Sequence, residues 1–416
     1  MKNLRVARLT VGSLVLAGLS RGTPSAFGWQ GQLVPGSQTS TRQEAQKDLA
    51  RLERNRFSDR PHASHPANGI GRKVAAASAS RTVSASGEVF FTSSFADHVT
   101  EGDVTGGEDP VVRQAAVAAL GHMNGTVLAI EPTSGRILAI VNQKLALSSG
   151  AQPCSTIKLS VALAALSEGI ITKETEVRIG ASYQNLTTAL ARSNNQYFET
   201  LGRELGFKKV SFHAHQYGLG ELAGLNISGE QPGVYPTEEI SPKLGGVGRM
   251  CSFGEGISMT PLQLGALVSA IANGGTLYYL QHPTTPEQAV DFQPVVKRQL
   301  DIAPLVGQIS DGMAGAVNYG TGRRVRYSFN EEEVLGKTGT CSRAGTRFGW
   351  FASYANTDVG RIVVVVFLQG GTPTFGPKAA EIAGRMYRRL YDHQFFAARP
   401  APTTIAATAK PMSAMR

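Results

Sequence analysis

The residues of this sequence best suited to chemistry are Ser155 and Lys158, in the stretch QPCSTIK at 152–158. Residues three apart lie on one face of a helix, so a helix beginning here would bring the lysine amine near the serine hydroxyl. A hydroxyl becomes a good nucleophile only when a neighbouring base takes its proton, and a lysine kept neutral by burial and nearby positive charge is such a base. The alternative is that Ser155 caps a helix and Lys158 is a solvated charge.

Two later motifs favour the chemical interpretation. SNN at 193–195 and KTGT at 337–340 follow in the order S-x-x-K, Ser/Asn element and K-T-G, which is the signature of penicillin-binding proteins and serine β-lactamases. The sequence therefore resembles the penicillin-binding transpeptidase family from about residue 109 to about residue 390. Further family-like runs are NGTVLAIEPTSGRILAIV (124–141), ALARSNNQYFETLGRELG (189–206), TPLQL (260–264), ANGG (272–275) and GTG (320–322).

The resemblance implies an α+β fold, in which an antiparallel β-sheet is covered by helices and joined to a mostly helical lobe. The site would lie in the cleft between the sheet and this lobe. Local patterns agree with that fold, since Asp109 and Pro110 are typical of a helix start and residues 127–130 and 137–141 alternate around a turn. The remaining predicted elements are helices from Ser155, over 261–272, 302–317 and 377–391, a loop over 221–244, and strands over 336–340, 347–355 and 361–368.

The same resemblance implies the catalytic roles. Ser155 would attack a peptide or β-lactam carbonyl and form an acyl-enzyme, with Lys158 as its base. Ser193 would relay a proton between Lys158, Lys337 and the leaving nitrogen. The positive charge of Lys337 would keep the neighbouring amine neutral and attract an anionic substrate. Taken alone, the SNN motif is equally typical of a polar turn.

Substrate contacts are implied for the residues that accompany these motifs. Asn195 would bind the substrate amide, and the hydroxyls of Thr338 and Thr340 would bind a terminal carboxylate. Gly339 would let the substrate backbone approach the strand edge. The backbone N–H groups of Ser155 and Thr340 would form the oxyanion hole.

Two cysteines flank these motifs. Cys154 precedes Ser155, and Cys341 follows Thr340. Because both motifs would line one cleft, we predict a disulfide, which resembles the bridge at matching positions of some carbapenem-hydrolysing serine β-lactamases. The alternative is a pair of small buried thiols. The eight His and three Cys show no metal-ligand spacing, so we expect neither a metal nor another cofactor.

Three functions are compatible with the motifs. The first is a D,D-transpeptidase or D,D-carboxypeptidase acting on D-Ala-D-Ala peptidoglycan stem peptides, with β-lactams as covalent inhibitors or substrates. The second is a serine β-lactamase, which must also activate a deacylating water. The third is a penicillin sensor that acylates and stops. The glutamates that follow the Ser/Asn motif are Glu221, Glu230, Glu238 and Glu239, and none has a recognisable β-lactamase pattern.

The chain divides into four predicted segments. Residues 1–28 are typical of a signal peptide, since basic residues precede a short apolar run and small residues. Residues 29–105 are expected to be a polar, largely disordered linker, 106–395 the transpeptidase domain, and 396–416 a disordered tail. We therefore expect export to the periplasm or the cell exterior, with membrane association only if the N-terminal segment is uncleaved.

Composition limits the partners. The 416 residues carry a net charge of +10, but the basic residues are diffuse and no nucleic-acid motif accompanies them. With 42% hydrophobic and 17% charged residues, the chain is suited to one large domain or two modest ones. We expect peptidoglycan stem peptides as the partner and no nucleic acid.

Overall fold

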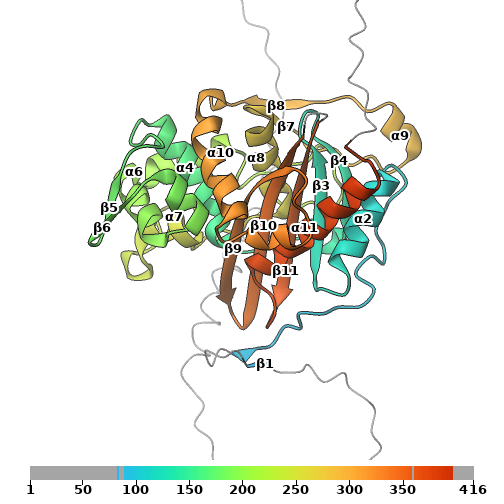
Figure 1. Cartoon of the computed structure of the whole chain (residues 1–416), viewed down its shortest axis with the longest axis horizontal. Coiled ribbons are helices and arrows are strands. Elements are labelled where there is room, and N and C mark those ends of the chain that lie inside the picture. The colour runs from blue at the N-terminus through green and yellow to red at the C-terminus, as the bar shows by residue number, and fades with distance from the viewer. Residues whose placement is uncertain (1–81, 84–88, 358–359, 397–416) are drawn as a thin grey trace, which may run out of the picture. The chain divides into compact units, whose positions relative to one another are not determined.

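The structure, a computed structural model, describes residues 82–83, 89–357 and 360–396, which all belong to the unit formed by residues 76–416. The predicted signal peptide, most of the predicted linker and nearly all of the predicted tail lie outside the described residues. Within the described part, an antiparallel sheet is combined with helices, which confirms the α+β class (Figure 1).

A five-stranded antiparallel sheet forms the framework, in the order β4-β3-β11-β10-β9. Its strands are β3 (Gly125–Glu131), β4 (Arg136–Val141), β9 (Glu333–Arg343), β10 (Thr346–Thr357) and β11 (Gly360–Gly370). The central strand, β11, carries the run IVVVV at 362–366, and such a β-branched run suits a strand buried on both faces. Strand β9 lies at the edge of the sheet.

Alternation along β11 divides the core into two clusters. Val363 and Val365 pack in the cluster that includes helix α8, whereas Val364 and Val366 pack in the cluster that includes α2 and α11. Successive side chains of a strand point to opposite faces, so one strand anchors both layers. The helices are α2 (Pro110–Leu120), α8 (Pro261–Asn273) and α11 (Gly376–Asp392), with α2 and α11 on one face in Figure 1.

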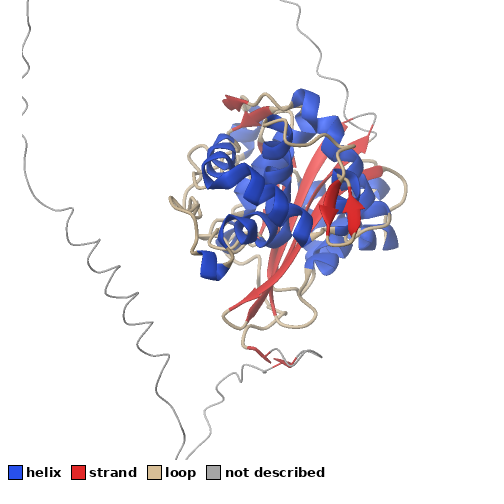
Figure 2. Cartoon of the chain, turned by 90° about the vertical axis from the view of Figure 1, so that its left-hand side faces the viewer, coloured by secondary structure: helices blue, strands red, loops and turns tan. Residues whose placement is uncertain are grey.

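A helical lobe adjoins the β9 edge of the sheet and faces the viewer in Figure 2. Its helices are α4 (Lys158–Ser167), α5 (Leu186–Arg192), α6 (Asn195–Gln216), α7 (Gly246–Phe253) and α10 (Ala303–Asn318). Most buried apolar side chains of this lobe belong to the same cluster as α8, whereas Val317 of α10 belongs to the cluster of α2 and α11, so the lobe and one sheet face largely share a core. The edge strand β9 is therefore held against the lobe.

The predicted hairpin, the predicted strands and the helices over 261–272 and 377–391 are confirmed with slightly longer bounds, and the helix over 302–317 is confirmed with a shift of one residue. Residues 221–244 are a loop apart from one short turn, η2 (Pro242–Leu244). Short elements that the sequence did not predict are α3 (Gln143–Ala146), β5 (Val177–Ile179), β6 (Ser182–Gln184), β7 (Thr276–Tyr278), α9 (Pro286–Val290), β8 (Val296–Gln299) and η3 (Arg323–Tyr327).

The predicted limits of the domain need correction at both ends. Residues 89–105 were assigned to the linker, but Phe90 is only 1% exposed, and Asp103 forms a salt bridge of 2.7 Å with Arg113 of α2. At the other end, Phe396 was assigned to the tail but is buried in the α2/α11 cluster. The linker assignment followed local composition, and these contacts are made with residues distant in the sequence. Strand β1 (Thr82–Val83) pairs with β2 (Val89–Phe90).

In the described part of the chain, every helix is too short or too polar to span a bilayer.

The cap of α2 gives a test of the fold. Asp109 accepts hydrogen bonds of 3.0 Å from the N–H groups of Val111 and Val112, so Asp109→Ala leaves them without this partner. We expect the free energy of unfolding to fall by about 1 kcal/mol. The matched control is Asp97→Ala, because the Asp97 side chain is 82% exposed and pairs with an exposed histidine. Urea titration measures both; equal stability of the two variants would contradict the capping role.

Candidate active site

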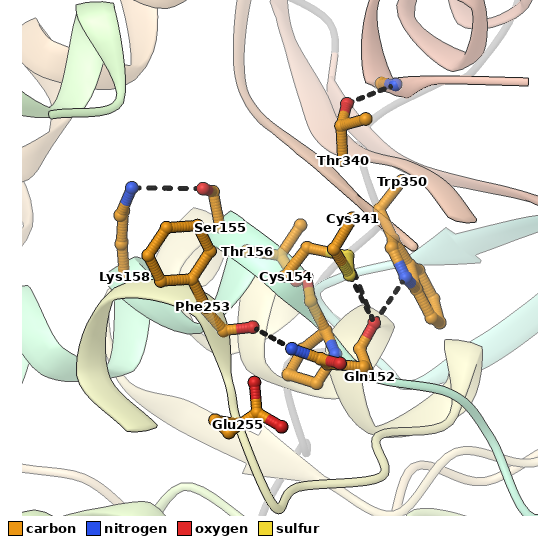
Figure 3. The surroundings of a disulfide bond; sticks show 12 residues. Gln152, Cys154, Ser155, Thr156, Lys158, Phe253, Glu255, Thr340, Cys341 and Trp350 are labelled. Atoms are coloured by element: carbon orange, nitrogen blue, oxygen red, sulfur yellow. Dashed lines mark hydrogen bonds between the residues drawn. A yellow bond between two sulfur atoms is a disulfide. The ribbon is translucent and has the colours of Figure 1, made fainter. Parts of the chain in front are cut away.

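Ser155 lies in the 3₁₀ turn η1 (Cys154–Ile157), which leads directly into α4. The predicted α-helix thus begins at Lys158 and not at Ser155. A 3₁₀ turn has three residues per turn, so side chains three apart are aligned more closely than in an α-helix. Lys158 Nζ lies 3.0 Å from Ser155 Oγ (Figure 3). The local structure therefore places the amine against the hydroxyl.

Oxygen atoms of the second motif surround the Lys158 amine. It lies 2.9 Å from Ser193 O, 3.2 Å from Ser193 Oγ and 2.6 Å from Asn195 Oδ1. The Lys158 side chain is fully buried, with 0% exposure. A neutral amine has two N–H donors and one lone pair, so it can donate to two of these oxygens and direct its lone pair at Ser155.

The SNN motif forms the junction between α5 and α6. Ser193 has φ of 58°, in the left-handed region that residues other than glycine rarely adopt. Asn194 caps α6 by accepting from the N–H of Tyr197 at 3.0 Å. The family-like Ser/Asn helix over 189–206 is thus interrupted at Ser193. The chain turns there, and the Ser193 hydroxyl lies 2.8 Å from Lys337 Nζ as well as near Lys158.

The two lysines share a buried site, which alters their protonation. Burial lowers the pKa of Lys337 from 10.5 to about 7. Burial also lowers the pKa of Lys158 well below 10.5, and the charge of Lys337 lowers it further, whereas Glu199 acts in the opposite direction with a smaller effect. Lys158 is therefore suited to act as a neutral base. Lys337 carries its charge only in part near pH 7.

The KTGT motif occupies the edge strand β9. The hydroxyls expected to bind a carboxylate have partners in the structure: Thr338 Oγ1 lies 2.5 Å from Thr321 Oγ1, and Thr340 Oγ1 accepts from the N–H of Gly376 at 2.8 Å. Thr321 was not predicted as a site residue. Its GTG run was the one signal in the sequence that pointed to it.

Gly339 makes room for the serine turn. A Cβ added at Gly339 would lie 2.8 Å from Pro153 O and 3.2 Å from Thr156 Cγ2. Real Cβ atoms essentially never approach another atom within 3.0 Å, so any side chain here would displace η1. From the sequence, we expected Gly339 to leave room for a substrate backbone at the strand edge. In the structure, the segment that approaches it is η1 of the chain itself.

A disulfide links the turn η1 to strand β9. Cys154 and Cys341 are bonded, with a Cα–Cα distance of 5.6 Å. The bond lies directly beside the two positions, Ser155 and Thr340, that were expected to form the oxyanion hole. The same turn is held by Gln152, whose carbonyl accepts from Trp350 Nε1 of β10 at 3.0 Å (Figure 3). Separately, Cys251 is a free, buried thiol.

The glutamates considered for a β-lactamase have other partners. Glu221 forms ion pairs with Arg298 and Lys297, and the Glu230 carboxylate accepts from the N–H groups of Ala223 and Gly224. Glu239 accepts from the N–H of Val247, and Glu238 is exposed. Among the described residues, none of these carboxylates is hydrogen-bonded to Ser155 or Lys158.

Comparison with known sequences agrees with this arrangement. The family described as penicillin binding protein transpeptidase domain matches residues 125–388. Stage V sporulation protein D of Bacillus subtilis is 28% identical, over 64% of this chain and 49% of that protein. The peptidoglycan D,D-transpeptidase MrdA of Acinetobacter baumannii is 23% identical, over 64% of this chain and 50% of that protein. The chain spans about half the length of these relatives.

Solved structures resemble the fold. Pseudomonas aeruginosa PBP2, solved in complex with WCK 5153, has a TM-score of 0.59 and 22% identity, covering 69% of this chain and 77% of that chain. The D,D-transpeptidase domain of a peptidoglycan glycosyltransferase from Eggerthella lenta has a TM-score of 0.55 and 20% identity, covering 69% and 82%. At these identities the likeness supports the arrangement of sheet and helices.

The disulfide gives a test of how the turn and the strand are held together. Because it closes a loop with a sequence separation of 187 residues, Cys154→Ala/Cys341→Ala should lower the free energy of unfolding by about 2–5 kcal/mol. Guanidinium titration with and without dithiothreitol measures the effect. Reductant should destabilise the parent protein and leave the double variant unchanged. Equal stability of the oxidised parent and the double variant would contradict a stabilising bridge.

Proposed function

We propose, because the chain belongs to the penicillin binding protein transpeptidase family, that it is an acyl-serine D,D-transpeptidase or D,D-carboxypeptidase of cell-wall synthesis. The observation that carries the proposal is the contact of the buried amine of Lys158 with both Ser155 Oγ and Ser193 Oγ. The names of the relatives, peptidoglycan D,D-transpeptidases among them, support the same activity.

Acylation would begin with proton transfer from Ser155 to the neutral amine of Lys158, 3.0 Å away. Ser155 Oγ then bonds to the carbonyl carbon of the penultimate D-Ala. As this intermediate collapses, the bond from that carbon to the leaving nitrogen breaks. The proton reaches the leaving nitrogen through Ser193, which contacts both lysines. Lys337 supports this relay because a pKa of about 7 lets it gain or lose a proton at working pH.

Charge developing on the carbonyl oxygen would be stabilised by the backbone N–H groups of Ser155 and Thr340. The two N–H groups can bind the same oxygen only if the turn η1 and the strand β9 keep a fixed separation. The disulfide beside both residues, and the absence of a side chain at Gly339, favour that fixed separation. Asn195 would bind the substrate amide once the substrate competes for its contact with Lys158.

The proposed substrate is a peptidoglycan stem peptide ending in D-Ala-D-Ala, whose terminal carboxylate binds at Thr338 and Thr340. The acyl group would pass to the amine of a second stem or to water, and β-lactams would acylate Ser155 in place of the peptide. A disulfide at the site is consistent with an oxidising location outside the cytoplasm. Export by residues 1–28, and a membrane anchor if they are retained, remain part of this proposal.

A serine β-lactamase is the second candidate, because the Cys154–Cys341 bridge of this chain resembles a disulfide found in some carbapenem-hydrolysing serine β-lactamases. That activity needs a base for the deacylating water. Glu221 and Glu230, which follow the Ser/Asn motif, are engaged by cations or backbone N–H groups elsewhere. This favours the transpeptidase over the β-lactamase. A sensor that acylates without turnover is the third candidate.

Reaction with a fluorescent penicillin tests the proposal. We expect a stable, stoichiometric adduct with the parent protein, none with Ser155→Ala, and acylation slowed by about 10²- to 10⁴-fold in Lys158→Met, because the base is lost. A time course that follows both protein-bound label and hydrolysed drug measures these rates. The control is Ser182→Ala, an exposed serine on β6, which should react normally.

Rapid release of hydrolysed drug without lasting label would identify a β-lactamase instead. A stable adduct that persists in Ser155→Ala would rule out the assigned nucleophile.

A further inference from the structure

A cavity of about 450 Å³ lies beside the candidate active site and has no assigned role. Three arginines, two aromatic residues and a threonine line it: Arg192, Arg323, Arg324, Tyr319, Phe375 and Thr321. We call it the arginine pocket. Its volume lies within the range of small-ligand sites and is larger than one carboxylate requires. None of the described residues that line it is acidic.

The arginine pocket adjoins the active site at three points. Arg192 immediately precedes Ser193 at the end of α5. Thr321 shares a hydrogen bond with Thr338 of the KTGT strand. Phe375 precedes Gly376, whose N–H donates to Thr340 Oγ1. The pocket therefore lies next to the proton relay and to the proposed carboxylate-binding hydroxyls.

The charges of this pocket are only partly compensated. Arg324 pairs with Glu381 at 3.3 Å and lies over the ring of Phe375 at 4.8 Å. Arg192 and Arg323 are exposed, and neither has a salt bridge to any residue of the described chain. Two arginines of one cavity without a carboxylate partner among the described residues are suited to bind an anion, since a guanidinium binds a carboxylate through two parallel hydrogen bonds.

The position of the pocket indicates which part of the reaction it serves. The leaving nitrogen departs on the side of Ser193, which relays its proton, and the incoming amine must approach the acyl carbon from the same side. The terminal carboxylate of the donor is already assigned to Thr338 and Thr340. We propose that the arginine pocket binds an additional acidic group of the molecule that supplies the acceptor amine. This inference rests on the proposed function.

Binding there would orient the amine for the second half-reaction. The amine nitrogen bonds to the acyl carbon, the ester bond from that carbon to Ser155 Oγ breaks, and the amine proton passes through Ser193 and Lys158 to Ser155 Oγ. No further reactant is needed. Arg192 and Arg323 would act as positioning residues that set acceptor specificity.

D-Glutamate and D-glutamine form a matched pair of acceptors, because they have the same shape and differ in one side-chain charge. The donor is a stem pentapeptide ending in D-Ala-D-Ala, and mass spectrometry measures replacement of its last residue. We expect the parent protein to prefer D-glutamate, and this preference to fall roughly tenfold or more in Arg192→Gln/Arg323→Gln. Arg192→Lys/Arg323→Lys, which keeps both positive charges, should retain part of the preference for D-glutamate. Arg178→Gln, an exposed arginine on β5, is the control.

Labelling by fluorescent penicillin separates the possible sources of the acidic group. Adduct formation should be unchanged in Arg192→Gln/Arg323→Gln if the pocket serves the acceptor. Slower adduct formation with an unchanged acceptor preference would assign the pocket to the donor and overturn the inference. If the parent protein forms the adduct but shows no preference for D-glutamate over D-glutamine, the inference about the arginine pocket is overturned and the proposed function is not. A parent protein that forms no adduct would overturn the proposed function and this inference with it.

Discussion

The structure depends most on the burial of two lysine amines around one serine hydroxyl. Lys158 and Lys337 are both fully buried, and both lie within hydrogen-bonding distance of Ser193 Oγ. Two ammonium groups in a dry site would repel each other and lose their hydration, so the favoured state leaves at least one amine neutral. The chemistry follows from this constraint, since a neutral Lys158 is a base and a charged one is not.

Burial of the two amines is energetically unfavourable, and the surrounding fold holds them in place. Ser193 is held in a left-handed conformation between two helices, and such a residue persists only where its neighbours fix it. The serine turn η1 is fixed from the other side by the edge strand, through the disulfide and through the space that Gly339 leaves for Pro153. Three chain segments, distant in sequence, therefore meet at Ser155. Displacement of any one would change the contact between Ser155 and Lys158.

The sequence predicted the elements whose signals are local. The alternation of the β3–β4 hairpin, the Asp109 cap and the β-branched run of β11 each depend on near neighbours, and each was predicted correctly. The motifs also identified which side chains would meet. The left-handed Ser193 and the role of Thr321 depend on contacts between distant segments. The same holds for the packing of residues 89–105, so the GTG run and the apolar residues near Phe90 hinted at these features without specifying their contacts.

The protonation state of Lys158 tests the account most directly. ¹⁵N NMR of lysine-labelled protein, with Lys158→Met to assign the resonance, measures the charge on Lys158 Nζ as the pH is raised. Because burial and Lys337 lower the pKa of Lys158 well below 10.5, we predict that the amine loses its charge well below that pH. An ammonium resonance for Lys158 that persists to pH 9 would contradict the account, because the base assigned to Ser155 would then have no free lone pair.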